Sequence, residues 1–190
     1  APNFVADANI KQPYIALLAG SRKQEIKSAL PVFAQLAGEN PEINFIVAGI
    51  SEWKELYTNY PIRVLYDQTY DILSHAHAAV VTSGTATLET ALFKVPEVVC
   101  YKGNWISYQI AKRIITLKYI SLVNLIMDKQ VVTELIQDDC NPKRIKEELA
   151  KLLEINHRNH LLAEYAILES KLGGIGASQK TAQLIVKEIL

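Results

Sequence analysis

The sequence predicts an α/β fold: an open parallel sheet of about six strands with helices on both faces and a helical C-terminal tail. Short runs rich in Val, Ile and Leu, without the alternation of a half-exposed strand, take turns with amphipathic stretches of helical length. This succession is typical of βαβ units in a Rossmann-like sheet. The composition agrees, because 49% of the residues are hydrophobic and 21% are charged, as in a globular domain.

Each element follows from a local pattern. The expected strands are the apolar runs 14–19, 43–48, 62–66, 78–81 and 97–101, with a weaker one at 120–122. The helices expected between them cover 24–38, 51–59, 69–76, 85–94 and 105–117. After residue 128 the pattern predicts helices alone, over 131–137, 142–154, 157–172 and 177–189. Pro142 indicates a helix start, and Gly173 with Gly174 indicates a helix end.

Charge and apolar length narrow the possible functions. Twenty basic residues balance twenty acidic ones, so no net field favours nucleic acid, and no nucleic-acid partner is expected. No apolar run approaches the roughly 20 residues of a membrane span. Two cysteines without a framework favour a reducing, cytoplasmic location. Residues 1–13 have no periodicity, and we expect them to be a linker or a remnant of a longer protein.

The first corner with chemical potential is LLAGSRKQEI, residues 17–26. In an open parallel sheet, ligands bind beyond the carboxyl ends of the strands. Gly20 and Ser21 follow the strand, and Arg22 adds a forked cation at the start of a helix, where an anion is favoured. Alternatively, Ser21 is a helix cap and Arg22 a solvated surface charge.

The second corner is VTSGTATLET, residues 81–90, where a buried strand ends in small and hydroxylated residues. Gly84 permits close approach to a ligand, and the following amides form a neutral cradle for a diphosphate. Glu89 lies four residues after Thr85 and therefore on the same helix face. A carboxylate there suits two sugar hydroxyls, although it also suits the helix dipole.

The third corner lies in SLVNLIMDKQVVTELIQ, residues 121–137. Asn124 is a lone amide in an apolar run and needs partners if it is buried. Glu134 and Gln137 are three residues apart on an expected helix and would share a face. As alternatives, Asn124 satisfies a turn and the other two are solvated.

Other chemistry has little support. The pairs His75 with His77 and His157 with His160 lack further ligands at the usual spacing, so no metal is expected. The sequence contains no GxGxxG, P-loop or GxSxG motif after a strand, which disfavours nicotinamide oxidoreductases, NTPases and α/β-hydrolases. No organic cofactor is expected.

Four blocks, in this order, closely resemble the carboxyl-terminal half of the lipid-A-disaccharide synthase family: LLAGSRKQEI, SGTATLETALFKVPEVVCYK, SLVNLIMDKQVVTELIQ and GASQKTAQLI. They cover nearly all of residues 14–190, and SGTATLE followed by the VPEVVCYK strand is a specific signature. The chain departs from the family at Ala19, Val123 and Thr133, where Pro is usual, and at Glu97, where Met is usual.

The resemblance implies one half of a B-type glycosyltransferase fold, with residues 14–190 as the donor-nucleotide domain. The diphosphate of a UDP-sugar would be bound by the two loops before the helices, at Gly20, Ser21, Arg22, Ser83, Gly84, Thr85 and Ala86. Glu89 would hold the ribose. The remaining donor pocket would include Asn124, Glu134 and Gln137, with Tyr66 and Gln68 near the uracil.

The family's reaction is also implied for the parent protein. An inverting transfer of 2,3-diacylglucosamine from UDP to 2,3-diacylglucosamine 1-phosphate would form the lipid A disaccharide of a Gram-negative bacterium. The acceptor site and the catalytic base would lie in a missing N-terminal domain, so this chain alone would be inactive. The parent would be peripheral at the inner face of the cytoplasmic membrane, and a segment-swapped homodimer is plausible.

Two alternatives remain open at this stage. The chain could belong to another UDP-sugar enzyme of the same fold, an N-acetylglucosaminyltransferase or an epimerase. It could instead be a non-catalytic nucleotide-binding or interaction module.

Overall fold

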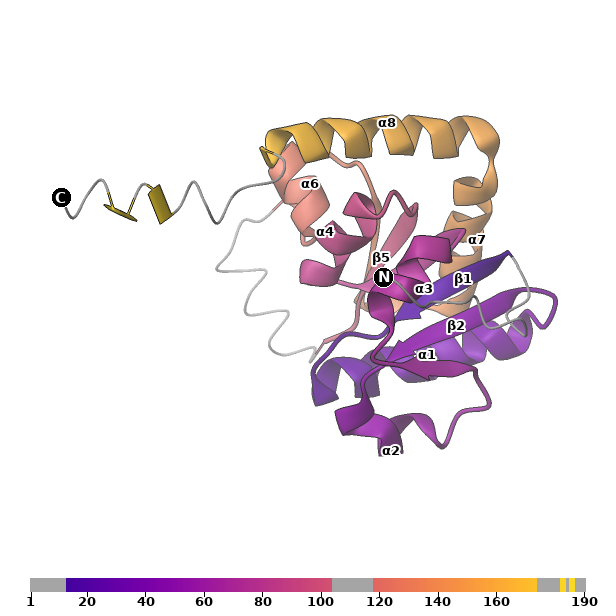
Figure 1. The fold of residues 1–190 in the computed structure, drawn as a ribbon. Helices are drawn as coiled ribbons and strands as arrows, with labels where there is room; N and C mark the ends of the chain where they lie inside the picture. The colour runs from indigo at the N-terminus through magenta and orange to yellow at the C-terminus, as the bar shows by residue number, and fades with distance from the viewer. Residues whose placement is uncertain (1–12, 104–117, 174–181, 184, 187–190) are drawn as a thin grey trace.

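The computed structural model describes residues 13–103, 118–173, 182–183 and 185–186, which form a parallel sheet flanked by helices (Figure 1). Its strands are β1 Tyr14–Leu18, β2 Asn44–Gly49, β3 Val64–Tyr66, β4 Ala78–Thr82, β5 Glu97–Tyr101 and β6 Thr133–Ile136. Every neighbouring pair is parallel. The expected fold class is confirmed. Three expected segments lie largely or wholly outside the described residues: the linker, of which only residue 13 is described, the helix over 105–117, and most of the helix over 177–189.

Helices cover both faces of this sheet. They are α1 Lys23–Glu39, η1 Ser51–Trp53, α2 Lys54–Tyr57, α3 Thr69–His75, α4 Thr85–Leu92, α6 Leu122–Met127, η2 Gln137–Asp139, α7 Pro142–Leu153 and α8 Ile155–Lys171. Successive residues of β1 point to opposite sides. Leu17 belongs to the core that includes α1 and α7, whereas Ala16 packs with Ile72 and Leu73 of α3.

The order of the strands creates a crevice. The order is β3-β2-β1-β4-β5-β6, so the chain proceeds outward from β1 in one direction and from β4 in the other. Leu18 pairs with Val81 at the carboxyl ends of these two central strands. The loops that leave them diverge, and this switch point is where open α/β sheets bind ligands.

Two predicted elements after residue 119 are wrong. The strand expected at 120–122 is absent, because Ser121 caps α6, its side chain accepting from the amide of Asn124. The helix expected over 131–137 is instead β6 with η2. The β-branched run that opens this segment fits a strand, and β6 completes the sheet by pairing with β5. Glu134 and Gln137 therefore do not share a helix face.

The predicted C-terminal helices are confirmed as α7 and α8 within the described residues. Asn141 caps α7 by accepting from the amide of Arg144 at 3.0 Å. In Figure 1, α8 runs from α7 back to α6. Two contacts fasten it to the sheet layer: Arg158 donates to the His77 carbonyl at 2.6 Å, and Lys94 pairs with Glu169 at 2.6 Å.

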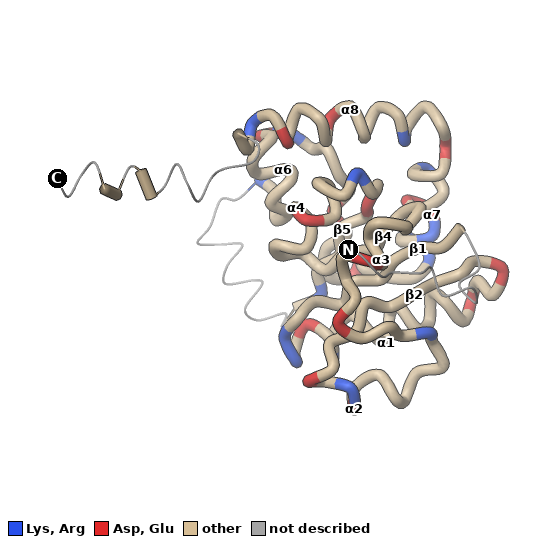
Figure 2. Tube along the Cα trace, viewed as in Figure 1, with Lys and Arg blue, Asp and Glu red and all other residues tan. Residues whose placement is uncertain are grey.

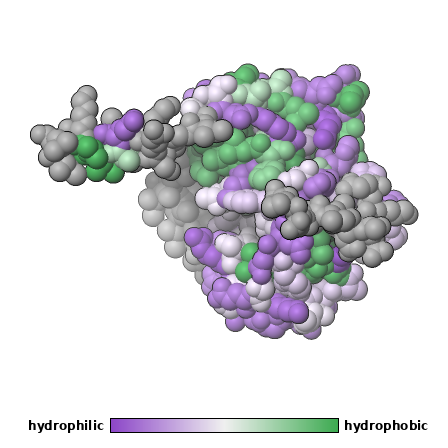
Figure 3. Space-filling view, viewed as in Figure 1, coloured by the Kyte–Doolittle hydropathy of each residue, from purple (hydrophilic) through white to green (hydrophobic). Residues whose placement is uncertain are grey.

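The surface is mixed in charge and locally apolar. Figure 2 shows acidic and basic residues interspersed over the described elements. Apolar residues gather over α4 in Figure 3, and exposed members of α3 and the end of α4 include Tyr70, whose ring stacks on Phe93 with centroids 5.4 Å apart. None of the helices in the described part combines the length and apolarity that a bilayer crossing requires.

Candidate functional site

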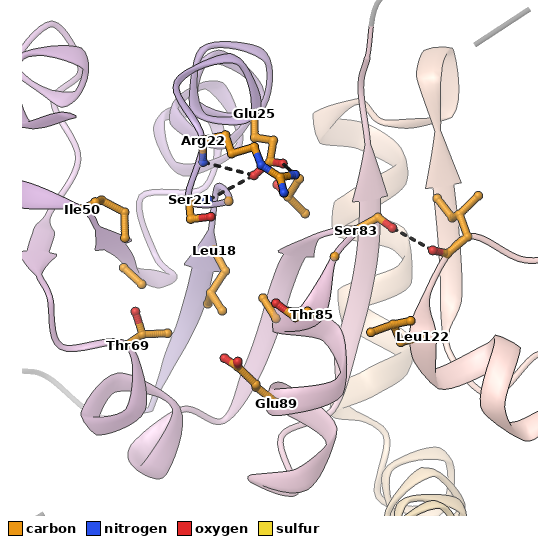
Figure 4. Close-up of a pocket in the computed structure, with 16 residues that line it drawn as sticks. Leu18, Ser21, Arg22, Glu25, Ile50, Thr69, Ser83, Thr85, Glu89 and Leu122 are labelled. Atoms are coloured by element: carbon orange, nitrogen blue, oxygen red, sulfur yellow. Dashed lines mark hydrogen bonds and ion pairs between the residues drawn. The ribbon is translucent and has the colours of Figure 1, made fainter. Parts of the chain in front are cut away.

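A pocket of about 520 Å³ lies at the switch point, beyond the carboxyl ends of β1 and β4. Eight predicted site residues line it: Gly20, Ser21, Arg22, Ser83, Gly84, Thr85, Ala86 and Glu89. The two loops predicted from separate parts of the sequence therefore meet at one cavity. In Figure 4, Arg22 and Glu89 lie on opposite sides of it.

The start of α4 presents backbone amides without a protein anion. Gly84 is the N-cap in an extended conformation, no side chain caps the helix, and its first turn contains no acidic residue. A Cβ added at Gly84 would meet no atom of the described chain within 4 Å. Since the first amides of a helix lack intrahelical acceptors, this end of α4 favours an anion in the pocket.

Glu89 lies one turn further along α4, facing the same pocket (Figure 4). Its side chain makes no hydrogen bond or ion pair with another described residue. A carboxylate with unused acceptor sites can receive two hydroxyl groups of a sugar. The predicted arrangement of a cradle followed by a carboxylate is therefore present geometrically.

The start of α1 differs, because its amides are already bonded. Glu25 Oε2 accepts from the amides of Ser21 and Arg22 at 3.1 and 3.2 Å. Its Oε1 lies 3.0 Å from Nη1 of Arg22, whose side chain is 84% exposed. Gly20 has φ +92°, and a Cβ there would lie 2.5 Å from Glu25 Oε2, so only glycine fits beneath this carboxylate.

Sequence reasoning missed Glu25. The pattern that could have found it is a capping box, in which the third helical residue bonds back to the N-cap amide. Here the N-cap is Arg22 rather than the usual Ser or Thr. The alternative in which Ser21 caps the helix is wrong, because the N-cap is Arg22. The alternative of Arg22 as a surface charge agrees with its 84% exposure, although its Nη1 pairs with Glu25.

A third wall of the pocket comes from the segment before α6, where Ile120 and Leu122 are in the lining. Ser83 Oγ donates to the Ile120 carbonyl at 3.0 Å, and the Ser83 amide donates to the Cys100 carbonyl at 2.8 Å. These bonds join the start of α4 to the carboxyl end of β5 and to the segment before α6. The Ser83 hydroxyl is thereby directed to the protein rather than to the pocket.

Asn124 and Glu134 hold this wall and do not line the pocket. The Glu134 carboxylate accepts from the amides of Ile120 and Ser121 at 3.0 and 2.9 Å and from the Ser121 hydroxyl at 2.8 Å. Asn124 is fully buried, and its Nδ2 donates to Glu134 at 2.8 Å. Its Oδ1 accepts from the amides of Val131 and Val132. The amide partners that a buried Asn requires are thus all backbone or Glu134.

The other predicted pocket residues also lie outside the lining. Tyr66 packs edge-on against Tyr57, with centroids 5.7 Å apart, and Gln68 is exposed before α3. Between them, Asp67 accepts from the Ser51 amide at 3.1 Å; hydrogen bonds from the Ser51 side chain and amide lower the pKa of Asp67. Gln137 begins η2, and its side-chain nitrogen is buried without a partner among the described residues.

Two residues near this turn do reach the pocket. Ile50 follows β2, and Thr69 begins α3. They provide an apolar side chain and a hydroxyl group on the side of the pocket away from Leu122 (Figure 4). Within the described ranges, no group of three or more His, Cys, Asp or Glu residues could hold a metal ion.

Comparison with known proteins identifies the relatives of this chain. A family model described as lipid-A-disaccharide synthetase matches residues 4–186. The lipid-A-disaccharide synthase of Nitrosococcus oceani is 39% identical over 185 residues, covering 90% of this chain and 47% of the relative. That of Syntrophus aciditrophicus is 38% identical over 181 residues, covering 88% and 47%. The chain thus spans about half the length of the curated relatives it matches.

Solved structures show the same fold at low identity. CalG4, the calicheamicin glycosyltransferase, superposes with a TM-score of 0.60 and 16% identity, covering 93% of this chain and 44% of that one. The spinosyn rhamnosyltransferase SpnG, complexed with spinosyn aglycone, gives a TM-score of 0.62 and 12% identity, covering 90% and 45%. The fold is therefore half of a glycosyltransferase architecture.

Proposed function

Because this chain belongs to the lipid-A-disaccharide synthase family, we propose that residues 14–190 form the donor domain of such an enzyme and bind the UDP part of UDP-2,3-diacylglucosamine. One observation carries the proposal. A helix start without a capping side chain, at Gly84 and Thr85, and a carboxylate one turn later, Glu89, face the same pocket at the switch point. The first suits a diphosphate and the second suits ribose hydroxyls.

The proposed pose follows the charges and shapes of the lining. The diphosphate lies against the amides of Thr85 and Ala86, and the guanidinium of Arg22 reaches it from the opposite side of the pocket. The ribose rests on Glu89. The uracil extends toward Ile50 and Thr69, next to the predicted Tyr66–Gln68 turn.

We propose that phosphate charge is met by amides and by Arg22, without a divalent cation. Arginine binds phosphate through several directed N–H groups, and amides at a helix start add fixed partial charge. UDP affinity is therefore expected to be the same with a chelator as with added Mg²⁺. A strong requirement for Mg²⁺ would contradict this part of the proposal.

For the whole protein we propose the family reaction, an inverting transfer of 2,3-diacylglucosamine to 2,3-diacylglucosamine 1-phosphate. The acceptor site and the catalytic base are assigned to an N-terminal domain outside this chain. The parent is proposed to act peripherally at the inner face of the cytoplasmic membrane, with a segment-swapped homodimer as one assembly. This chain alone is expected to bind UDP without transferring sugar; turnover of donor and acceptor by it would refute that division.

The test is calorimetric titration of the 190-residue chain with UDP. Glu89→Ala and Arg22→Ala are each expected to weaken binding about tenfold to a hundredfold, the value of a charge-assisted hydrogen bond. Arg144→Ala is a matched control, because Arg144 is exposed on α7 and, among the described residues, its side chain pairs with the neighbouring carboxylates of Glu147 and Glu148. A UDP affinity unchanged by both Glu89→Ala and Arg22→Ala would show that the nucleotide binds elsewhere.

A further inference from the structure

The donors at the start of α1 converge on a group of the protein itself. The two amides of Ser21 and Arg22 and one guanidinium nitrogen bond the Glu25 carboxylate at 3.0 to 3.2 Å. These are the groups that the sequence assigns to a ligand anion. A carboxylate presents two oxygens to paired donors, as a phosphate does. Glu25 therefore occupies the place that an anion would take at α1.

The charges of the pocket make this contact consequential. Among the described residues of the lining, the charged side chains are Arg22, Glu25 and Glu89, with a net formal charge of −1. A diphosphate entering this pocket meets like charge unless Glu25 withdraws. It also finds two amides and one guanidinium N–H already bonded at α1.

The geometry allows the exchange. The Glu25 side chain is 28% exposed, so it can turn toward solvent. Arg22 is 84% exposed, and its bond to Glu25 uses one of the five N–H donors of a guanidinium. The glycine at position 20 leaves the space above the α1 amides free of a Cβ. A phosphate could thus replace the carboxylate on the same donors.

We propose that Glu25 is a built-in substitute for the ligand anion, displaced when a diphosphate binds, and that it thereby sets how strongly the site prefers phosphates. This inference rests on the proposed nucleotide site and assigns to it a specificity-determining residue. The unaltered protein obtains little net gain from the two α1 amides, because each phosphate contact replaces an existing carboxylate contact. The guanidinium N–H groups of Arg22 that do not bond Glu25 still contribute to binding. Removing the charge of Glu25 makes those donors available.

The experiment is a set of titrations with uridine, UMP, UDP and inorganic pyrophosphate. Glu25→Gln keeps the size and an acceptor oxygen for the helix start but removes the charge. It is expected to tighten UDP and pyrophosphate about tenfold, to tighten UMP less, and to leave uridine unchanged. Glu39→Gln is the matched control: it makes the same change at the other end of α1, where the Glu39 side chain accepts from Gln35 and from no other residue that the structure describes.

The outcomes separate this inference from the proposed function. Weaker or unchanged UDP and pyrophosphate binding by Glu25→Gln would overturn the inference and make Glu25 a support for Arg22. Tighter pyrophosphate with UDP no better than pyrophosphate would keep Glu25 in its role and refute the nucleotide assignment. If neither the unaltered chain nor Glu25→Gln bound any of these ligands, both the inference and the proposed function would be refuted. Glu25→Asp, which keeps the charge, should not tighten either anion, and thermal melting must show that each variant is folded.

Discussion

Two helix starts meet at the pocket, and they differ in what satisfies their amides. Both follow central parallel strands, α1 after β1 and α4 after β4. At α1, the Glu25 carboxylate bonds two amides and the guanidinium of Arg22. At α4, Gly84 supplies no side chain and the first turn has no acid.

The difference teaches that a helix start is not in itself an anion site. What matters is whether a carboxylate of the protein already accepts hydrogen bonds from the amides at the helix start. By this criterion α4 is the open receptor of the pocket, and the amides of α1 contribute only through exchange with Glu25. The contrast depends on two residues, Gly84 and Glu25, and can be tested by altering either.

The largest effect is expected from making α4 resemble α1. Gly84→Asp places a carboxylate at the N-cap, where it accepts from the helix amides. Because Gly84 is extended (φ 161°) and a Cβ there meets no described atom within 4 Å, the fold should be unaffected. Loss of two charge-assisted contacts predicts UDP binding more than about a hundredfold weaker, measured by calorimetry.

The control for this change is Gly84→Asn, which caps the helix without charge. It should weaken UDP less than the aspartate does, and both variants should melt at or slightly above the temperature of the unaltered chain. If Gly84→Asp retained full affinity for UDP, α4 would not be the anion receptor. The contrast between the two helix starts would then lose its functional meaning.

An intermediate effect is expected from the wall that joins α4 to α6. Glu134→Gln replaces one acceptor oxygen by a donor that faces the amides of Ile120 and Ser121. We expect a loss of about 1–3 kcal/mol in the free energy of unfolding and a UDP affinity lower by up to about tenfold. Glu147→Gln, exposed on α7, is the matched control. Weaker UDP with unchanged stability would instead indicate direct contact with the ligand.

The sequence predicted the central sheet well, for a physical reason. The strands β1, β2, β4 and β5 are buried on both faces, so their apolar runs stand out from the helices between them. β6 is an edge strand with only Leu135 buried. The three-residue spacing of Glu134 in β6 and Gln137 in η2 allowed a helix to be predicted, but pairing with β5 decides the structure.

The sequence predicted the two loops that form the pocket, but not the hydrogen bonds that join them to the rest of the chain. The strand-end rule located Arg22 and Glu89 because it depends on topology alone. Glu134 and Asn124 were assigned to the pocket, but their bonds to Ile120 and Val131 join segments that only the folded chain brings together. The occupation of α1 by Glu25 depends on the conformation at the N-cap, which residue types do not specify.

The smallest effect on ligand binding is expected at the amino ends of the strands, away from the pocket, where Glu97 begins β5. This carboxyl group is fully buried, and neither oxygen has a partner among the described residues. Burial raises the pKa of Glu97 well above its ordinary value of 4.5. A raised native pKa means that the unfolded chain releases this proton first, so stability falls as the pH rises above about 4.5.

Glu97→Met, which replaces the carboxyl group by an apolar side chain of similar length, should remove that pH dependence and stabilise the chain by about 1–3 kcal/mol near neutral pH. Urea denaturation from pH 4.5 to 8 measures it: the advantage of the variant should grow with pH until the native carboxyl ionises. Glu97→Gln should lose the pH dependence while keeping a buried polar group. UDP affinity should not change in either variant, because the anion receptor lies at the carboxyl ends of the strands, whereas Glu97 lies at an amino end. A change in UDP affinity would show that the two ends of the strands are coupled and that UDP binding depends on more than the amides at α4.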